Sequence, residues 1–312
     1  MDPLATVDYA KDTTYAFMLG AHAAGHEVFY LPAGGITLEG NRGRFAAVPV
    51  VPHDDPEHLF DVSPGVVLSD DDVDVIFIRN NPPFDAHYLM NTWLLDPLTD
   101  RMAIINSPAA IRSANEKLWA MQFPDLMPPT LVTQTRNEFD RFLKEHGTIV
   151  TKPTDGFGGQ GVFILHQEDP NALVVFETLS ENETRHIILQ GLVPEAIHGD
   201  KRILLLDGEI LGAVLRVHGE NDHRNNFFAG GHAVPTELTE RDREIAATLK
   251  PYLVQQELHF VGIDVLGDAL IEVNVTSPTC LQEINRITGR RLEQQVIAFA
   301  EALASRKHRS TV

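Results

Sequence analysis

The stretch from Val261 to Thr279 constrains the fold most, because its strand-forming apolar residues are interrupted by only a few polar ones. Gly267 and Asp268 are turn residues in its middle, which predicts a β-hairpin. Apolar strands are usually buried, and a buried carboxylate or amide is costly unless it is paired or binds a metal. The polar residues in question are Asp264, Glu272 and Asn274.

The spacing of these polar residues predicts a shared metal site. Glu272 and Asn274 are two residues apart and therefore lie on one face of a strand. Such oxygen ligands, with Asp264 nearby, suit Mg²⁺ better than zinc or iron. A two-residue turn would put Asp264 on the opposite face, so we expect an odd-length connection, such as three residues with a bulge. The alternative is that the three side chains bond to backbone or to an arginine.

The composition narrows the class of protein. A length of 312 residues suggests two domains of about 150 residues each. The net charge of −19 argues against nucleic-acid binding and requires a local positive cluster for any anionic ligand. We expect a cytoplasmic protein without a membrane partner, because no apolar run approaches the ~20 residues of a membrane helix and no signal peptide is visible.

Strand and helix signals alternate along the chain, which indicates an α/β fold. Ser277 and Pro278 are expected to be the N-cap and first residue of a helix. We expect helices at about 13–25, 86–95, 108–122, 137–146, 239–256, 278–286 and 290–305. We expect a hairpin over 36–51 and strands at about 26–31, 73–79, 103–106, 131–133, 148–152, 161–166, 173–177, 186–190, 202–206 and 210–217.

A glycine-rich loop from Gly156 to Gly161 satisfies G-x-G-x-x-G, but a strand follows it where a dinucleotide fold would need a helix. The loop is either a flap whose N–H groups close over phosphate or a flexible hairpin turn. Lys152, at the end of the preceding strand, is a candidate phosphate contact. Lys117, predicted on a helix beside Glu116, is a second candidate phosphate contact. The alternative is that Lys117 is exposed and forms a local ion pair.

Three arginines provide the best candidate for a positive cluster. Arg202, Arg216 and Arg224 surround the strands 202–217 and the loop after them, and they either bind carboxylate and phosphate groups or form scattered surface ion pairs. The polar segment 218–231 reads as a lid, a binding loop or a disordered loop. None of the 14 histidines has the spacing of metal ligands, so none is assigned to a metal. Cys280 is the only cysteine, which excludes an intrachain disulfide.

A series of motifs runs through the chain in one order. They are Met1-Asp-Pro, Lys11-Asp, Arg79-Asn-Asn-Pro-Pro-Phe-Asp, Asn115-Glu-Lys-Leu, Lys152-Pro, Asp155-Gly-Phe-Gly-Gly, Gly199-Asp-Lys-Arg, Ala229-Gly-Gly, Val261-Gly-Ile-Asp and Glu272-Val-Asn-Val-Thr-Ser-Pro-Thr. Together they resemble the bacterial glutathione synthetase family of the ATP-grasp ligases.

The resemblance implies an α/β ATP-grasp fold with three parts. These are an N-terminal α/β (pre-ATP-grasp) domain over 1–114, a small lid subdomain over 115–190 and a C-terminal mixed-sheet subdomain over 191–312. It also implies the reaction: ATP phosphorylates γ-glutamylcysteine, and glycine attacks the acyl phosphate to give glutathione, ADP and phosphate. The implied cofactors are ATP and two Mg²⁺ ions, with Mn²⁺ as the alternative, and the implied assembly is a homo-oligomer, often a tetramer.

Roles for individual residues follow from the same resemblance. The metals would be held by Asp264, Glu272 and Asn274. ATP would be bound by Lys117, Lys152, Gly156, Phe157, Gly158, Gly159, Gln190, Gly191, Leu192 and Asp200. The peptide or the transferring phosphoryl group would be bound by Arg202, Arg216, Arg224, Asn226, Ser277 and Thr279, with Arg202, Arg216 and Lys152 acting in catalysis.

The chain departs from the family pattern at its start, at Asn80 and Asn81, and in the sequence of the lid. Family members begin with a β-strand before Met-Asp-Pro, so we expect this first strand to be absent here. Asn80 and Asn81 replace the usual Lys-Asp, which changes the charge near the expected peptide site. Two other hypotheses therefore stay open: a sister ligase for a different amino acid or peptide, and a non-catalytic nucleotide-binding scaffold.

Overall fold

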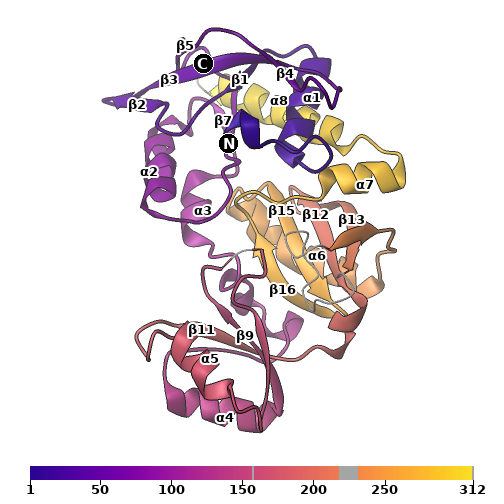
Figure 1. Ribbon diagram of the computed structural model, residues 1–312. Coiled ribbons are helices and arrows are strands. Elements are labelled where there is room, and N and C mark those ends of the chain that lie inside the picture. The colour runs from indigo at the N-terminus through magenta and orange to yellow at the C-terminus, as the bar shows by residue number, and fades with distance from the viewer. Residues whose placement is uncertain (157, 218–230, 311–312) are drawn as a thin grey trace.

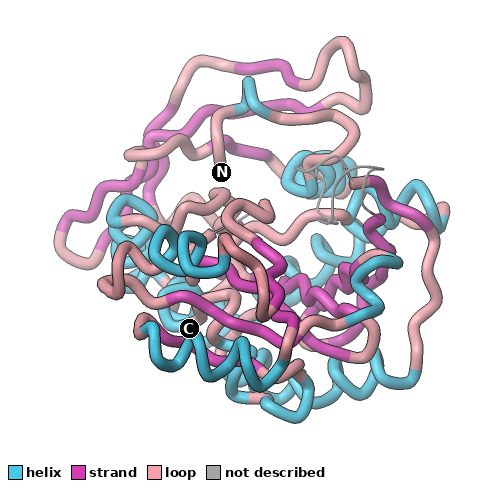
Figure 2. The backbone as a smooth tube through the Cα atoms, turned by 60° about the horizontal axis from the view of Figure 1, so that its bottom comes forward, coloured by secondary structure: helices cyan, strands magenta, loops and turns pink. Residues whose placement is uncertain are grey.

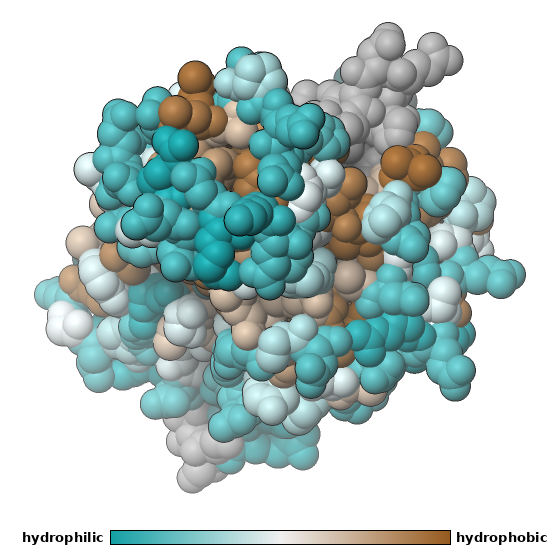
Figure 3. Space-filling view, turned by 90° about the horizontal axis from the view of Figure 1, so that it is seen from below, coloured by the Kyte–Doolittle hydropathy of each residue, from teal (hydrophilic) through white to brown (hydrophobic). Residues whose placement is uncertain are grey.

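The computed structural model describes residues 1–156, 158–217 and 231–310. Its strands form an α/β fold in three parts. In Figure 1 the N-terminal part lies at the top, the C-terminal part below it and the middle part at the bottom. In the described ranges, every helix is too short or too polar to cross a membrane. The face shown in Figure 3 is mainly hydrophilic, in keeping with the net charge of −19.

The N-terminal part is built around the long strand β3 (Arg42–Pro52), to which four antiparallel strands pair. These are β1 (Val28–Tyr30), β2 (Ile36–Glu39), β4 (Phe60–Val62) and β5 (Val66–Ser69). A separate parallel pair consists of β6 (Val75–Phe77) and β7 (Ala103–Ile105). The helical elements are η1 (Leu4–Thr6), α1 (Thr13–Ala23), α2 (Ala86–Leu95), η2 (Asp96–Leu98) and α3 (Pro108–Ser113). Asp12 caps α1, because its side chain accepts a hydrogen bond from the Tyr15 N–H.

The middle part is a four-stranded antiparallel sheet in the order β10-β9-β11-β8. Its strands are β8 (Thr130–Thr133), β9 (Thr148–Pro153), β10 (Phe163–His166) and β11 (Ile187–Gly191). Two helices, α4 (Arg136–His146) and α5 (Ala172–Leu179), cover one face of it (Figures 1 and 2). The glycine loop joins β9 to β10, so the strand–loop–strand prediction and the exclusion of a dinucleotide fold are confirmed.

The C-terminal part is a five-stranded sheet in the order β14-β13-β12-β15-β16. Its strands are β12 (Asp200–Leu206), β13 (Glu209–Val217), β14 (His232–Val234), β15 (Phe260–Leu266) and β16 (Ala269–Asn274). The remaining helical elements are η3 (Trp119–Gln122), η4 (Pro124–Leu126), η5 (Pro194–His198), α6 (Glu240–Gln255), α7 (Leu281–Thr288) and α8 (Leu292–Ser310). Thr239 begins α6 with a capping box.

The C-terminal sheet has a core on each face, because successive side chains of a strand point to opposite sides. Ile203 and Leu205 pack with α6 and η3 on one face. Leu204 packs on the other face with α7, α8 and the N-terminal elements α1 and β7. This second core joins the N-terminal part to the sheet that carries the polar hairpin, as the yellow helix α8 shows at the top of Figure 1.

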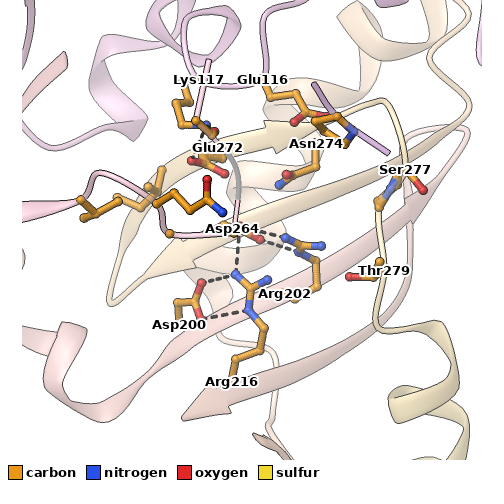
Figure 4. Close-up of a pocket in the computed structure, with 18 of the residues that line it drawn as sticks. Glu116, Lys117, Asp200, Arg202, Arg216, Asp264, Glu272, Asn274, Ser277 and Thr279 are labelled. Atoms are coloured by element: carbon orange, nitrogen blue, oxygen red, sulfur yellow. Dashed lines mark hydrogen bonds and ion pairs between the residues drawn. The ribbon is translucent and has the colours of Figure 1, made fainter. Parts of the chain in front are cut away.

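The hairpin of β15 and β16 confirms one prediction and corrects another. Its turn has only two residues, because Leu266 pairs with Ala269, so the predicted odd-length connection is wrong. A β-bulge leaves Ile271 as the extra residue instead, and Asp264 consequently lies opposite Glu272. The predicted arrangement of the three polar side chains on one face is confirmed (Figure 4).

The predicted helix 108–122 is interrupted in the structure. Helix α3 ends at Ser113, and the side chain of Asn115 accepts hydrogen bonds from the N–H groups of Lys117 and Leu118. This local turn competes with the helical hydrogen bonds. Lys117 therefore lies in a turn between α3 and η3, and its predicted place on a helix is wrong.

Two further elements differ from the prediction. The segment 173–177 is part of helix α5, although its valines favour a strand, because Ala172 and Phe176 are four residues apart and pack together on the middle sheet. Ser277 does not cap a helix, since α7 begins at Leu281. The cap position is Cys280, which is buried and has a positive φ of 85°.

Candidate active site

A cavity of about 800 Å³ lies where the three parts of the chain meet. All the predicted site residues that the structure describes line this cavity, and Figure 4 shows part of its wall with ten residues labelled. They are Lys117, Lys152, Gly156, Gly158, Gly159, Gln190, Gly191, Leu192, Asp200, Arg202, Arg216, Asp264, Glu272, Asn274, Ser277 and Thr279. Three further predicted residues, Phe157, Arg224 and Asn226, lie outside the described residues.

Two buried arginines and two aspartates form one network on the floor of the cavity (Figure 4). Arg202 is bidentate to Asp264, with Nε 2.5 Å from Oδ1 and Nη2 3.0 Å from Oδ2. The Nη2 atom of Arg216 is 2.9 Å from Asp264 Oδ2, and its Nε donates to Asp200 Oδ1 at 3.0 Å. Arg202 and Arg216 therefore form a compact buried cluster. The alternative interpretation, in which these arginines make scattered ion pairs on the surface, is wrong for both.

Asp264 is ionised in this network. Burial alone would raise the pKa of its carboxyl group, but the guanidinium groups of Arg202 and Arg216 outweigh burial and lower the pKa below its ordinary value. Gly262, two residues before Asp264 and on the same face of β15, allows the contact: a Cβ there would lie 3.1 Å from Arg202 Cδ and 2.9 Å from Pro278 Cβ. The aliphatic part of Arg202 can therefore cross β15 only at a glycine.

Two lysines face the opposite wall, and their surroundings differ. Lys117 Nζ is 3.3 Å from Glu272 Oε1 and also donates to the backbone oxygen of Gly156. Burial lowers the pKa of Lys117, but the Glu272 and Glu116 carboxylates together outweigh it and the net shift is upward. Lys152 is 5% exposed, and among the described residues no hydrogen bond or ion pair holds its ammonium group. Burial lowers the pKa of Lys152.

A buried cation without a partner is destabilising, so its retention in a cavity wall indicates an anionic ligand. The ammonium groups of Lys117 and Lys152 both lie at the end of the cavity that carries the glycine loop. Gly158 and Gly159 have positive φ angles of 61° and 75°, which suits a loop that turns its N–H groups toward a ligand.

The donor atoms of the hairpin fit a hard divalent cation. Asn274 donates its Nδ2 to the Gly262 carbonyl at 3.2 Å, which leaves its side-chain oxygen as an acceptor. Glu272 has a single ion pair within the described part of the chain, with Lys117, and it lines the cavity. Asp264 accepts three bonds from arginines, so only one lone pair of Oδ1 is left. Glu272 and Asn274 are therefore better placed than Asp264 to bind a metal ion. Asp264 instead pairs with arginines, as the alternative interpretation of the sequence proposed.

Glu116 is a structural residue of the site that the sequence did not reveal. Its Oε1 accepts hydrogen bonds from the N–H groups of Val275 and Thr276 and from the Thr276 hydroxyl. Its own carbonyl accepts from the Val273 N–H. It thereby fixes the chain directly after Asn274. No local signal could have found it, because its partners are about 160 residues away.

Arg79, which follows β6, is the second site residue that the sequence did not single out. It is 4% exposed and lies over the rings of Phe17 and Phe260. Its Nη2 donates to the Pro278 carbonyl at 2.8 Å, whereas its buried Nη1 has no partner among the residues that the structure describes. Burial lowers the pKa of Arg79 to about 10. The sequence contained one signal for Arg79, because the apolar strand predicted over 73–79 ends in this charged residue.

Outside the cavity, one further group of side chains has the composition of a metal site, although the sequence analysis assigned no histidine to a metal. His53, His58 and Asp61 have ligand atoms within 4.8 Å of one another. Each oxygen of Asp61 already accepts a hydrogen bond from one of the histidines at 2.8 Å. The group is largely exposed and satisfies its own hydrogen bonds, so it does not indicate a metal site.

The fold is that of the ATP-grasp proteins. The structure is similar to a Chryseobacterium gregarium RiPP-associated ATP-grasp ligase in complex with ADP, with a TM-score of 0.63, 14% identity and coverage of 96% of this chain and 95% of that chain. It is also similar to the D-alanine–D-alanine ligase of Bacillus anthracis, with a TM-score of 0.54, 15% identity and coverage of 77% and 82%. At these identities the likeness concerns the fold alone.

The sequence comparisons define the family. The prokaryotic glutathione synthetase N-terminal domain matches residues 1–112, and the ATP-grasp domain of the same family matches residues 116–289. Similar relatives are the glutathione synthetases of Yersinia pestis, 39% identical over 98% of both chains, and of Rhodopseudomonas palustris, 38% identical over 97% of this chain and 96% of that one. The chain belongs to the prokaryotic glutathione synthetase family. It is therefore an ATP-dependent carboxylate–amine ligase, which uses ATP with a divalent metal, as the sequence resemblance implied.

Proposed function

We propose that this chain makes glutathione from γ-glutamylcysteine and glycine. The γ-phosphoryl group of ATP passes to the cysteinyl carboxylate and ADP leaves. The glycine amine then attacks the acyl phosphate, an amide bond forms, the amine loses a proton and phosphate leaves. One observation supports this chemistry most strongly: among the described residues, the cavity brings buried arginines, a lysine without a hydrogen-bond or ion-pair partner, and oxygen donors onto facing walls, and it holds no nucleophile–base pair.

The residues of this chain act mainly by positioning and by charge, which phosphoryl transfer needs more than a protein nucleophile. Lys117 and Lys152 bind the ATP phosphates, and the loop residues Gly156, Phe157, Gly158 and Gly159 cover them. Gln190, Gly191 and Leu192 lie beside the adenine. Asp200 lies near the ribose, although in the structure its carboxylate also orients Arg216.

Arg202 and Arg216 bind the peptide carboxylate and then the oxyanion that forms when the amine attacks. Both guanidinium groups are already oriented by Asp264, so little reorganisation accompanies the reaction. Arg224, Asn226, Ser277 and Thr279 complete the peptide site, with Ser277 near the glutamyl end. Glu272, Asn274 and the remaining lone pair of Asp264 would hold the metal, which would supply positive charge to neutralise the phosphates. We assign two Mg²⁺ ions, with Mn²⁺ as a substitute.

Three further assignments complete the proposal. The N-terminal domain covers 1–114, the lid subdomain 115–190 and the C-terminal subdomain 191–312. The assembly is a homotetramer, and the protein works in the cytoplasm. The assembly can be tested by measuring the molar mass in solution, and the domain boundaries by limited proteolysis with and without ATP.

A sister ligase is the second candidate, because Asn81, which replaces a charged family residue, lines the cavity. The assay that separates the candidates measures ADP release with γ-glutamylcysteine, with and without glycine, and then with other amines. Glycine-dependent ADP release supports the proposal. Turnover only with another amine or peptide would favour the sister ligase, and ATP binding without any turnover would favour a scaffold.

A further inference from the structure

One end of the active-site cavity is formed where helices α1 and α7 begin. The Leu281 N–H at the start of α7 donates to Thr13 Oγ1 at the start of α1, and Gln282 Nε2 donates to the Asp12 carbonyl at 2.6 Å. In Figure 1 both helices lie above the C-terminal sheet, whereas the middle part that carries the glycine loop lies below it. The two helix starts therefore form one wall of the cavity at the end away from the nucleotide loop.

Glu283, in the first turn of α7, lines this wall with a carboxylate that lacks a hydrogen-bond donor. Its side chain is 7% exposed, and its buried Oε2 atom has no hydrogen-bond partner in the part of the chain that the structure describes. The Arg286 Nη2 atom is 3.8 Å from Glu283 Oε1, which is too far for a hydrogen bond. A buried acceptor of this kind is costly unless a ligand supplies the donor.

The aspartates at the same end of the cavity are in a different situation. Asp2, Asp8 and Asp12 each accept a hydrogen bond from a backbone N–H group, and each therefore has a structural partner. Glu283 is the buried carboxylate of this wall that is left to bind a positively charged donor on a ligand.

A positive group lies near Glu283 without bonding to it. Lys11 lines the same end of the cavity, and among the described residues no hydrogen bond or ion pair holds its ammonium group. Burial raises the pKa of Glu283, and the charges of Arg286 and then Lys11 are among the effects that oppose burial. Helix α1 begins at Thr13, directly after Lys11 and its neighbour, so the positive end of the helix dipole lies beside this lysine. The wall thus offers an acceptor for a cation and, separately, a positive site for an anion.

A carboxylate and a cationic group that lie near each other without bonding match the head of an α-amino acid, which carries an ammonium and a carboxylate on one carbon. In γ-glutamylcysteine the glutamyl residue is linked through its side chain, so both head groups are free. Glycine has the same two groups, but its amine must lose a proton before it attacks, and a carboxylate that holds it as an ammonium would oppose that step. The wall therefore fits the glutamyl head rather than glycine.

We propose that Glu283 binds the α-ammonium group of the γ-glutamyl residue, that Lys11 binds its α-carboxylate, and that the pair selects γ-linked peptides. The inference rests on the proposed function, because it names the part of the peptide substrate that this wall holds. In an α-linked glutamyl peptide the α-carboxylate is consumed in the amide bond. Lys11 would then have no ligand on the carbon that bears the ammonium.

The experiment combines one substitution with one change in the substrate. The unmodified chain and Glu283→Gln are assayed for ADP release with glycine and either γ-glutamylcysteine or glutaryl-cysteine, which lacks only the α-amino group. In the unmodified chain, loss of the amine should raise KM at least ~10-fold, as expected for one charge-assisted hydrogen bond. Glu283→Gln should raise KM for γ-glutamylcysteine by a similar factor with little change in kcat, and it should leave KM for glutaryl-cysteine unchanged.

The matched control is Glu301→Gln, which alters an exposed glutamate paired with His26 and should leave both KM values unchanged. Thermal unfolding excludes a folding defect, because Glu283→Gln removes a buried charge and should not lower Tm. A second cycle pairs Lys11→Met with 4-aminobutanoyl-cysteine, which lacks only the α-carboxylate, and should show the same loss of additivity.

An equal rise in KM for γ-glutamylcysteine and glutaryl-cysteine in Glu283→Gln would overturn the proposal, and so would a rise confined to the KM of glycine. In either case normal glycine-dependent ADP release by the unmodified chain would leave the proposed function intact. If the unmodified chain releases no ADP with γ-glutamylcysteine and glycine, the proposed function fails and this inference fails with it.

Discussion

At the scale of single residues, the two lysines of the candidate active site differ in what balances their charge. Glu272 balances Lys117, whereas Lys152 is buried and unpartnered in the described part of the chain. The sequence could predict that a lysine stands beside the glycine loop, because strand and loop signals are local. It could not predict which lysine is paired, because Glu272 is more than a hundred residues from both.

Lys152→Met should separate function from stability. The substitution removes a buried cation that has no hydrogen-bond or ion-pair partner among the described residues, so we expect kcat/KM for ATP to fall at least ~10²-fold while Tm stays the same or rises. Steady-state kinetics and thermal unfolding measure the two effects. The control is Lys250→Met, which alters an exposed lysine paired with Glu209. A Lys152→Met protein with normal ATP kinetics would remove Lys152 from the phosphate site.

The lowered pKa of Lys152 also predicts a pH dependence of ATP binding. The protonated ammonium group binds phosphate, so affinity should decline as the pH rises through the pKa of this group. Because burial lowers that pKa from 10.5, the decline should begin at a lower pH than an exposed lysine would give. Calorimetric titration with a non-hydrolysable ATP analogue measures it. In Lys152→Met the decline should be absent, and its persistence there would assign it to another group.

Glu272→Gln tests the metal assignment. The change keeps the shape of the side chain but removes the charge that faces the cavity and pairs with Lys117. We expect kcat to fall at least ~10²-fold, by analogy with the loss of one electrostatic stabiliser, and the Mg²⁺ concentration for half-maximal activity to rise. Glu209→Gln, on the exposed side of β13, is the matched control. Near-normal kcat with an unchanged Mg²⁺ dependence would contradict the assignment.

At the scale of elements, the segment after β16 has its conformation set by Glu116 rather than by its own sequence. Three hydrogen bonds to one carboxylate oxygen fix Val275 and Thr276. Ser277 and Thr279 reach the cavity wall as a result, although no helix begins at Ser277. The sequence motif was thus correctly placed at the site, while the local structure that it was expected to form was wrong.

Glu116→Ala should therefore affect both the stability and the peptide site. It leaves three donors without their acceptor, so we expect the free energy of unfolding to fall by about 2 kcal/mol or more, with an increase in KM for γ-glutamylcysteine. Urea unfolding and kinetics measure these changes. Glu116→Gln keeps an acceptor oxygen and should restore most of the stability. If Glu116→Ala and the exposed variant Glu244→Ala are equally stable, the anchoring role is wrong.

How far the elements could be predicted depended on where their determinants lie. Helix α1, the hairpin of β2 and β3 and the strands around the glycine loop follow from local caps, turns and periodicity, and they were predicted. The bulge at Ile271, the helix α5 and the break before Lys117 were missed. The bulge depends on cross-strand pairing and α5 on packing against the middle sheet, and neither is visible in a short window of sequence.

At the scale of the whole molecule, the family and the fold could be recognised from motifs spread over the full chain, whereas the joining of the parts could not. The core that links α1, β7 and α8 to the C-terminal sheet unites segments from both ends of the sequence. Arg79 strengthens the same junction, because it bonds to the Pro278 carbonyl and lies over Phe17 and Phe260. The active site thus depends on contacts between the two ends of the sequence.

The net charge of −19 predicts how the whole molecule responds to salt. It arises from 44 acidic against 25 basic residues, so the folded state carries a general self-repulsion that an unfolded chain relieves. Raising NaCl from about 0.02 to 0.3 M shortens the screening length below ~10 Å and should raise Tm by a few degrees, with little further gain at higher concentration. Thermal unfolding in NaCl and KCl measures this, and the two salts should agree because screening depends on ionic strength. A Tm that falls with salt would mean that the attractive pairs, such as those among Arg202, Arg216 and Asp264, outweigh the general repulsion.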